Sequence, residues 1–151
     1  MSARYLVVDG HSVIFSWPDL RAMHTRNRAA ARKALADMLQ LLHDTTSWRV
    51  TLVLDGKLGT AVSTGPRKPT DMVVSYATAD QTADSIIERL VAASGVARDV
   101  TVVTGDEAER LTVESLGAST VSPTWLREEL EREKALFSAE MERLHRSQRW
   151  K

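Results

Sequence analysis

The amino-acid sequence predicts an α/β fold, namely a three-layer α/β/α sandwich on a mostly parallel sheet of about five strands. Short apolar runs alternate with amphipathic segments of about 10 to 20 residues, which is the pattern of βαβ units. The runs are almost continuously apolar, as expected for strands that helices cover on both faces. Two runs also end at an aspartate followed by glycine, so their carboxyl ends lead directly into a turn or a loop.

The first two expected strands share one ending. The run at residues 5–8 stops at the pair Asp9-Gly10, and the run at 50–54 stops at the pair Asp55-Gly56. Each pair is either a turn or part of a charged site. A helix is expected between the two strands, at residues 28–44, because its apolar residues recur at helical spacing. These residues are Ala31, Leu35, Met38, Leu39 and Leu42.

The middle of the chain contains a long loop, a strand and a helix. The segment 56–71, "GKLGTAVSTGPRKPTD", is expected to be a loop, and loops of this length are often functional. A third strand follows at 72–76. The sequence "TADQ" at 78–81 matches a capping box, and the apolar stripe at 83–91 predicts the helix that it opens.

The last third of the chain repeats the alternation. A strand is expected at 100–103, a short helix at 106–117 and a fifth strand at 118–121. From Pro123 to about 147 the pattern predicts a long amphipathic helix. Its first half should cover the sheet, and its second half should project and offer a surface to a protein partner or to another copy of the chain.

Composition limits the possible functions. A chain of 151 residues fits a single domain, and the absence of cysteine excludes disulfides, thiolate zinc ligands and a cysteine nucleophile. The formal net charge is zero, so a nucleic-acid partner would have to be attracted by local basic patches. There is neither a bilayer-spanning apolar run nor a signal-peptide pattern at the N-terminus. We therefore expect a cytoplasmic protein without membrane association.

Four carboxylates are expected at one edge of the sheet. Asp9, Asp55 and Asp106 follow predicted strands, and Asp84 lies in the opening turns of the helix after the third strand. Gathered like charges repel, so such a cluster implies a cation. Oxygen ligands without His or Cys suit Mg²⁺ or Mn²⁺, either of which could orient water for attack on a phosphodiester.

Each carboxylate also has a purely structural interpretation. Asp9 and Asp55 are ordinary turn residues, Asp106 is a candidate helix cap, and Asp84 suits a helix N-terminus. Their predicted convergence at one edge favours the functional interpretation.

The blocks "LVVDGHSVIFSWPDL", "VTLVLDGK", "ADQTADSIIERLV" and "VTVVTGDEAER" resemble the YacP-like branch of the NYN domains, in the PIN-like nuclease superfamily. The resemblance covers residues 5 to about 130. It implies a PIN-like (Rossmann-like) sheet and a metal-dependent ribonuclease. It further implies metal binding by Asp9, Asp84 and Asp106, with Asp55 completing the pocket directly or through water.

The sequence departs from the family pattern at two positions. Ser12 replaces the asparagine that usually follows the first aspartate by three residues, and Ser85 replaces an acidic residue after Asp84. Supporting roles are expected for Ser12 and Thr104, which can position ligands by hydrogen bonds. Asp80 and Glu88 are expected on the helix face of Asp84.

Basic and aromatic residues are candidates for RNA contacts. A basic rim would offset the repulsion between the carboxylates and a phosphate backbone. Trp17 is a candidate for stacking on an unpaired base or, alternatively, for packing beside Pro18. The basic candidates are Lys57, Arg67, Lys68, Arg26 and Arg28, together with Arg32 and Lys33.

The leading hypothesis is a Mg²⁺- or Mn²⁺-dependent endoribonuclease that acts on single-stranded or unpaired RNA. The main alternative is an NYN-type RNA-binding or adaptor module with weakened catalysis, which the Ser12 substitution favours. A phosphotransfer receiver is a third interpretation. It would need a lysine after a late strand, and "TVSPTWL" does not contain one.

Overall fold

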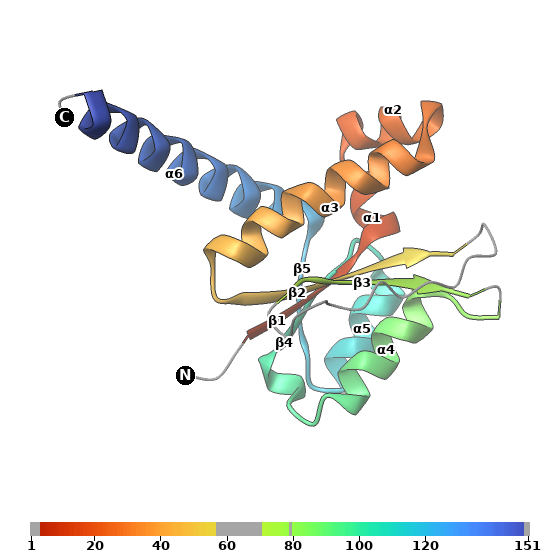
Figure 1. The fold of residues 1–151 in the computed structure, drawn as a ribbon. Coiled ribbons are helices and arrows are strands. Elements are labelled where there is room, and N and C mark those ends of the chain that lie inside the picture. Colours follow the sequence, from red (N-terminus) through yellow and green to blue (C-terminus); the bar gives the residue numbers. More distant parts are fainter. Residues whose placement is uncertain (1–3, 57–70, 79, 150–151) are drawn as a thin grey trace.

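In the computed structural model, helices cover both faces of a parallel β-sheet (Figure 1). The structure describes residues 4–56, 71–78 and 80–149. In chain order the elements are β1 (Arg4–Asp9), α1 (Gly10–Ser16), α2 (Pro18–Arg26), α3 (Arg28–Thr45), β2 (Trp48–Asp55), β3 (Val73–Ala77), α4 (Ala83–Ala93), the 3₁₀ helix η1 (Ala97–Asp99), β4 (Val100–Val103), α5 (Glu107–Ser115), β5 (Ser119–Val121) and α6 (Pro123–Arg149). All five predicted strands are present. The loop expected at 56–71 lies almost entirely outside the described residues.

The order of the strands is β3-β2-β1-β4-β5, and every neighbouring pair is parallel. The chain moves outward from β1 to β2 and β3, and then continues on the other side of β1 with β4 and β5. The direction of winding therefore reverses between β1 and β4. In open parallel sheets, ligands bind outside the carboxyl ends of the strands at such a switch point.

Two apolar clusters, one on each face of the sheet, make up the core. Figure 1 shows α1, α2, α3 and the start of α6 on one face, and α4 and α5 on the other. In β1, Leu6 and Val8 join the cluster on the α3 side, whereas Val7 joins the cluster on the α4 side. This alternation explains the continuously apolar strands, and the predicted three-layer sandwich is confirmed.

Helices α1 and α2 were not among the predicted elements. The Asp9-Gly10 pair starts α1 directly, because Asp9 Oδ1 accepts a hydrogen bond from the Ser12 N–H and caps the helix. A Cβ atom at residue 10 would lie 2.5 Å from Leu54 Cδ2 and 3.0 Å from the Val53 carbonyl oxygen, so a larger residue would have to displace the Leu54 side chain of β2. Pro18 then occupies the first turn of α2, where its missing N–H costs nothing.

The capping box of α4 lies four residues later than predicted. Thr82 Oγ1 accepts a hydrogen bond from the Ser85 N–H, and Ser85 Oγ accepts one from the Thr82 N–H. The sequence "TAD" occurs twice in succession, and the helix uses the second copy. The prediction at 78–81 was therefore wrong, and Asp84 lies in the first turn of α4.

Helix α6 is 27 residues long and extends beyond the sheet (Figure 1). Its first turns are anchored by the buried side chains Leu126 and Leu130. Further along the helix, the exposed apolar side chains are those of Leu136, Phe137, Met141 and Leu144. Within the described ranges, none of the helices combines the length and the apolar character that a membrane span requires.

Candidate active site

A pocket of about 650 Å³ opens at the carboxyl ends of the strands, beside the switch point between β1 and β4. The four predicted aspartates all line it: Asp9, Asp55, Asp84 and Asp106. Segments far apart in the sequence therefore converge as the sheet topology requires. The shared location of the four carboxylates is the strongest structural argument for a charged site here.

Asp9 forms part of the pocket floor and is only 5% exposed. It is the last residue of β1, in the strand next to β4, and its Oδ1 atom caps α1. Its Oδ2 atom lies 3.3 Å from Thr104 Oγ1, across the switch point. Both carboxylate oxygens are thus held in place, which fixes the direction in which Asp9 faces the pocket.

Asp84 brings a second carboxylate to the pocket from the first turn of α4. Partial burial raises the pKa of Asp84 above its ordinary value, and the negative charges of Asp9, Asp106 and Asp55 raise it further. The neighbouring carboxyl group of Glu109 opposes this rise. The four predicted aspartates therefore lie within electrostatic reach of one another, as well as lining a common pocket.

Glu109 is a site residue that the sequence did not reveal. Its carboxylate forms a cluster with those of Asp9 and Asp84, in which one oxygen from each side chain lies within 4.8 Å of the others. The side chain is 2% exposed, and burial together with the neighbouring Asp9 and Asp84 raises the pKa of Glu109 to about 10. Among the described residues, Glu109 Oε1 has no hydrogen-bond partner. The cluster therefore holds an acid that stays protonated at neutral pH.

Thr104 connects two of the three clustered carboxylates. Its hydroxyl donates a hydrogen bond of 2.9 Å to Glu109 Oε2 and lies 3.3 Å from Asp9 Oδ2. It also accepts a hydrogen bond from the Asp106 N–H. Because Thr104 is buried directly after β4, it fixes both carboxylates relative to the sheet.

Asp106 and Asp55 lie at the rim of the same pocket. Asp106 caps α5, because its Oδ1 atom accepts hydrogen bonds from the N–H groups of Ala108 and Glu109. The predicted metal set was Asp9, Asp84 and Asp106, whereas the cluster in the structure has Glu109 as its third member. Asp55 is half-buried, and its Oδ2 atom lies 3.8 Å from His11 Nδ1.

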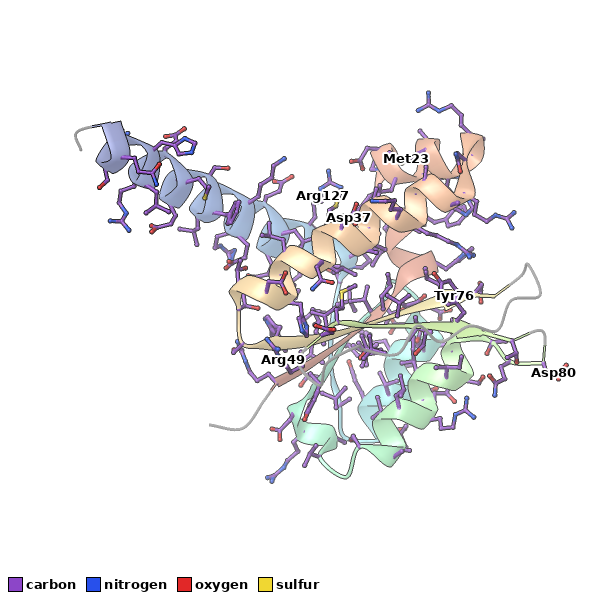
Figure 2. The ribbon with its side chains drawn as sticks, in the orientation of Figure 1. Met23, Asp37, Arg49, Tyr76, Asp80 and Arg127 are labelled. Atoms are coloured by element: carbon purple, nitrogen blue, oxygen red, sulfur yellow. The ribbon has the colours of Figure 1, made fainter. Side chains whose placement is uncertain are left out.

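The two supporting acids do not join the pocket. Asp80 precedes α4 and is exposed in the loop ahead of it, so the expected shared helix face with Asp84 is wrong for this residue (Figure 2). Glu88 lies one turn after Asp84 on α4, and neither acid is among the described side chains that line the pocket. The later start of α4 explains why Asp80 falls outside the helix.

The predicted RNA contacts have mixed outcomes. Trp17 is 4% exposed, and its Nε1 atom donates a hydrogen bond of 3.0 Å to the Pro123 carbonyl oxygen. It therefore packs in the core, and the prediction that it stacks on a base was wrong. Arg26 and Arg28 are exposed at the junction of α2 and α3. The remaining basic candidates, Lys57, Arg67 and Lys68, lie outside the described residues.

A local signal for Glu109 was present in the sequence. Glu109 follows the helix cap Asp106 by three residues, so it lies in the first turn of α5. Side chains in a helix tilt toward its N-terminus, which here faces the pocket. An acid at this spacing after a strand-end aspartate therefore points back to the same sheet edge.

Comparison with known proteins identifies the family. Residues 6–151 match the family model described as the YacP-like NYN domain. The chain belongs to the YacP-like NYN domain family. A curated member, the uncharacterized protein YacP of Bacillus subtilis (strain 168), is 30% identical over 129 residues, which cover 83% of this chain and 74% of YacP.

Solved structures of this NYN family have the same fold. The crystal structure of Rae1 (YacP) from Bacillus subtilis superposes with a TM-score of 0.81 at 25% identity, covering 98% of this chain and 84% of Rae1. A mutant of Rae1 gives a TM-score of 0.79 at 24% identity, covering 94% and 84%. Membership of the NYN family supports a ribonuclease-type function, with RNA as the class of substrate.

Proposed function

We propose that this protein is a divalent-metal-dependent endoribonuclease that hydrolyses phosphodiester bonds in single-stranded or unpaired RNA. The proposal depends above all on the cluster of Asp9, Asp84 and Glu109, whose carboxylate oxygens lie within 4.8 Å at the switch point of the sheet. The ribonuclease-type family supplies RNA as the substrate.

The cluster is chemically suited to a hard divalent cation. It offers three oxygen ligands, the type that Mg²⁺ and Mn²⁺ prefer. Glu109 Oε1 is buried without a hydrogen-bond partner among the described residues, so it is available as a ligand. In the same part of the chain, no lysine or arginine forms an ion pair with any of the three carboxylates. A cation would thus supply the missing positive charge.

In this proposal, Asp9, Asp84 and Glu109 would hold the metal. Thr104 would fix the positions of the Asp9 and Glu109 carboxylates. When bound, the metal supplies a Lewis acid that polarises the phosphate and lowers the pKa of a bound water. Asp55 Oδ2, at the accessible rim, accepts a proton from the attacking water. The water oxygen bonds to phosphorus, one P–O ester bond breaks, and the departing oxygen receives a proton from solvent, to which Asp55 later returns the proton that it accepted.

Basic side chains complete the proposal. Carboxylates repel phosphates, so substrate binding needs nearby positive side chains. We assign phosphate contacts to Arg26 and Arg28, and to Lys57, Arg67 and Lys68 in the segment after β2. Asp106 assists from the rim, directly or through water.

The test is cleavage of purified single-stranded and hairpin RNAs in Mg²⁺, in Mn²⁺ and in chelator. We expect cuts in unpaired segments that require the metal and are lost in Asp9→Asn and Glu109→Gln. A parallel melting experiment should show that metal stabilises the wild-type protein and neither variant. Loss of both effects would link the metal to the cluster.

The matched control is Asp37→Asn. Asp37 is an exposed aspartate on α3, on the outer side of the molecule, where it pairs with Lys33 at 2.7 Å (Figure 2). The Asp37→Asn variant should cleave RNA as the wild type does. RNA binding without metal-dependent cleavage or stabilisation would favour the adaptor alternative over the ribonuclease.

A further inference from the structure

Phe15 is an exposed aromatic side chain beside the acidic pocket. It is 40% exposed and lines the pocket together with Ser12 and Ser16. It also borders a second hollow of about 370 Å³, whose other lining residues include Pro18, Arg21 and Thr25. The ring thus stands on the ridge between the acidic pocket and the surface of α2. An apolar ring that a core does not need is available to a ligand that crosses this ridge.

The ring of Phe15 belongs to a row of three. Its centroid lies 4.4 Å from that of His11, on the pocket side, and 5.0 Å from that of His24, on α2. His11 and Phe15 are four residues apart on α1, so they share one helix face. The row is therefore an aromatic surface that leads from the pocket toward α2.

Positive charge lies at the outer end of this row. Partial burial lowers the pKa of His24, and the charges of Arg28 and Arg32 lower it further, so both arginines lie within electrostatic reach of the ring. In the described part of the chain, Arg21, Arg28 and Arg32 take part in no ion pair, whereas Lys33 pairs with Asp37. These arginines beside a row of aromatic rings match the alternating phosphates and bases of a single strand.

We propose that Phe15 is the stacking platform for an unpaired base next to the scissile phosphate, and that the strand continues over α2 toward Arg21, Arg28 and Arg32. This inference rests on the proposed ribonuclease function and adds a substrate subsite to it. Stacking on an aromatic ring needs an unpaired base and tolerates any base. The platform thereby selects single-stranded RNA without selecting a sequence.

The first test compares Phe15→Ala with the wild type on a single-stranded RNA that is cut at one site. Loss of stacking should raise KM about five- to hundredfold and leave kcat nearly unchanged. Phe15→Trp should restore KM, whereas Phe15→Leu, which has no π face, should not. The matched control is Phe137→Ala, since Phe137 is 48% exposed on α6 and does not border the pocket.

An abasic RNA separates stacking from a structural effect. When the nucleotide beside the cut lacks its base, Phe15→Ala and wild type should have equal KM values, because there is no base to stack. Equal KM values on the intact RNA, or the same loss on the abasic RNA, would overturn the platform.

A measurement of RNA binding separates base stacking on Phe15 from RNA cleavage. A 2-aminopurine at the position beside the cut loses fluorescence when it stacks. Quenching by the wild type and by Phe137→Ala, but not by Phe15→Ala, would support the platform. If quenching depends on Phe15 but the wild type never cleaves, the ribonuclease proposal fails and Phe15 remains only a base-stacking site for RNA binding. If it cleaves with quenching that does not depend on Phe15, only the platform fails.

Discussion

The hydroxyl of Ser12 accepts a hydrogen bond of 2.6 Å from the backbone N–H of Gly105. The bond joins the first turn of α1, which follows β1, to the loop that follows β4. It therefore links the two sides of the switch point at the edge of the acidic pocket. The serine that stands in place of the asparagine usual in NYN domains thus has a defined partner.

Ser12→Ala should loosen the pocket. The loss of one hydrogen bond should cost about 1 kcal/mol in the free energy of unfolding. Misplacement of Asp9 relative to α5 should lower kcat by up to about tenfold. Urea unfolding and steady-state cleavage measure the two effects. The control is Thr112→Ala, because the exposed Thr112 hydroxyl donates a hydrogen bond to the Ala108 carbonyl oxygen within α5 and is not among the described residues that line the pocket. Equal losses in both variants would contradict this role for Ser12.

The metal-free protein should become less stable as the pH rises. Glu109 keeps its proton in the folded state up to a pKa of about 10, whereas the unfolded chain releases it near 4.5. Between these values the folded state binds the extra proton, so stability falls by up to about 1.4 kcal/mol per pH unit. Glu109→Gln should flatten this dependence in urea unfolding with chelator. Glu107→Gln, at an exposed residue paired with Arg110, should not. An unchanged slope in Glu109→Gln would contradict the assignment.

Metal affinity should increase with pH. A cation at the cluster needs the ionised form of Glu109, so binding displaces about one proton, and the raised pKa of Asp84 adds to this. The affinity for Mn²⁺ should rise about tenfold per pH unit below the pKa of Glu109. Calorimetry in two buffers of different ionisation enthalpy measures the released proton. Binding without proton release would mean that the metal does not contact Glu109.

Trp17→Phe should affect stability and not RNA binding. It removes the hydrogen bond from the indole N–H to the Pro123 carbonyl oxygen, which costs about 0.5–1.5 kcal/mol. The cation–π contact of Arg127 with the indole, at 4.7 Å from the ring centroid, is also weakened. Thermal unfolding should report the loss, while KM for RNA stays that of the wild type. A raised KM in a fully folded variant would return Trp17 to the list of RNA contacts.

The fold was predictable where one local signal dominates. Both β4 and α3 follow from apolar runs and helical spacing, and they lie close to the expected bounds. Helices α1 and α2 were missed because Gly10 and Pro18 normally interrupt helices. Here each lies at a helix start, where the missing side chain or N–H carries no penalty. Only the packing of α1 against β2 reveals the need for glycine.

The position of the site could be predicted from the sequence better than the residues that form it. Strand-end aspartates lie at one sheet edge because parallel strands share a direction, so Asp9, Asp55 and Asp106 could be placed from topology. Glu109 belongs to the cluster because its side chain tilts toward the N-terminus of α5. Trp17 is buried because its side chain packs against α6. Both outcomes depend on helix orientation, which sequence periodicity does not specify.

In each of the two Asp-Gly pairs, the aspartate and the glycine have different roles. At Gly56, as at Gly10, an added Cβ would collide with a neighbouring strand, in this case 1.7 Å from the Ala77 carbonyl oxygen. A mutational scan that scores protein abundance should therefore show stronger intolerance at both glycines than at the preceding aspartates. A scan that scores RNA turnover should show intolerance at all four. In each Asp-Gly pair, folding thus depends mainly on the glycine and chemistry on the aspartate, and selection can act on the two residues separately.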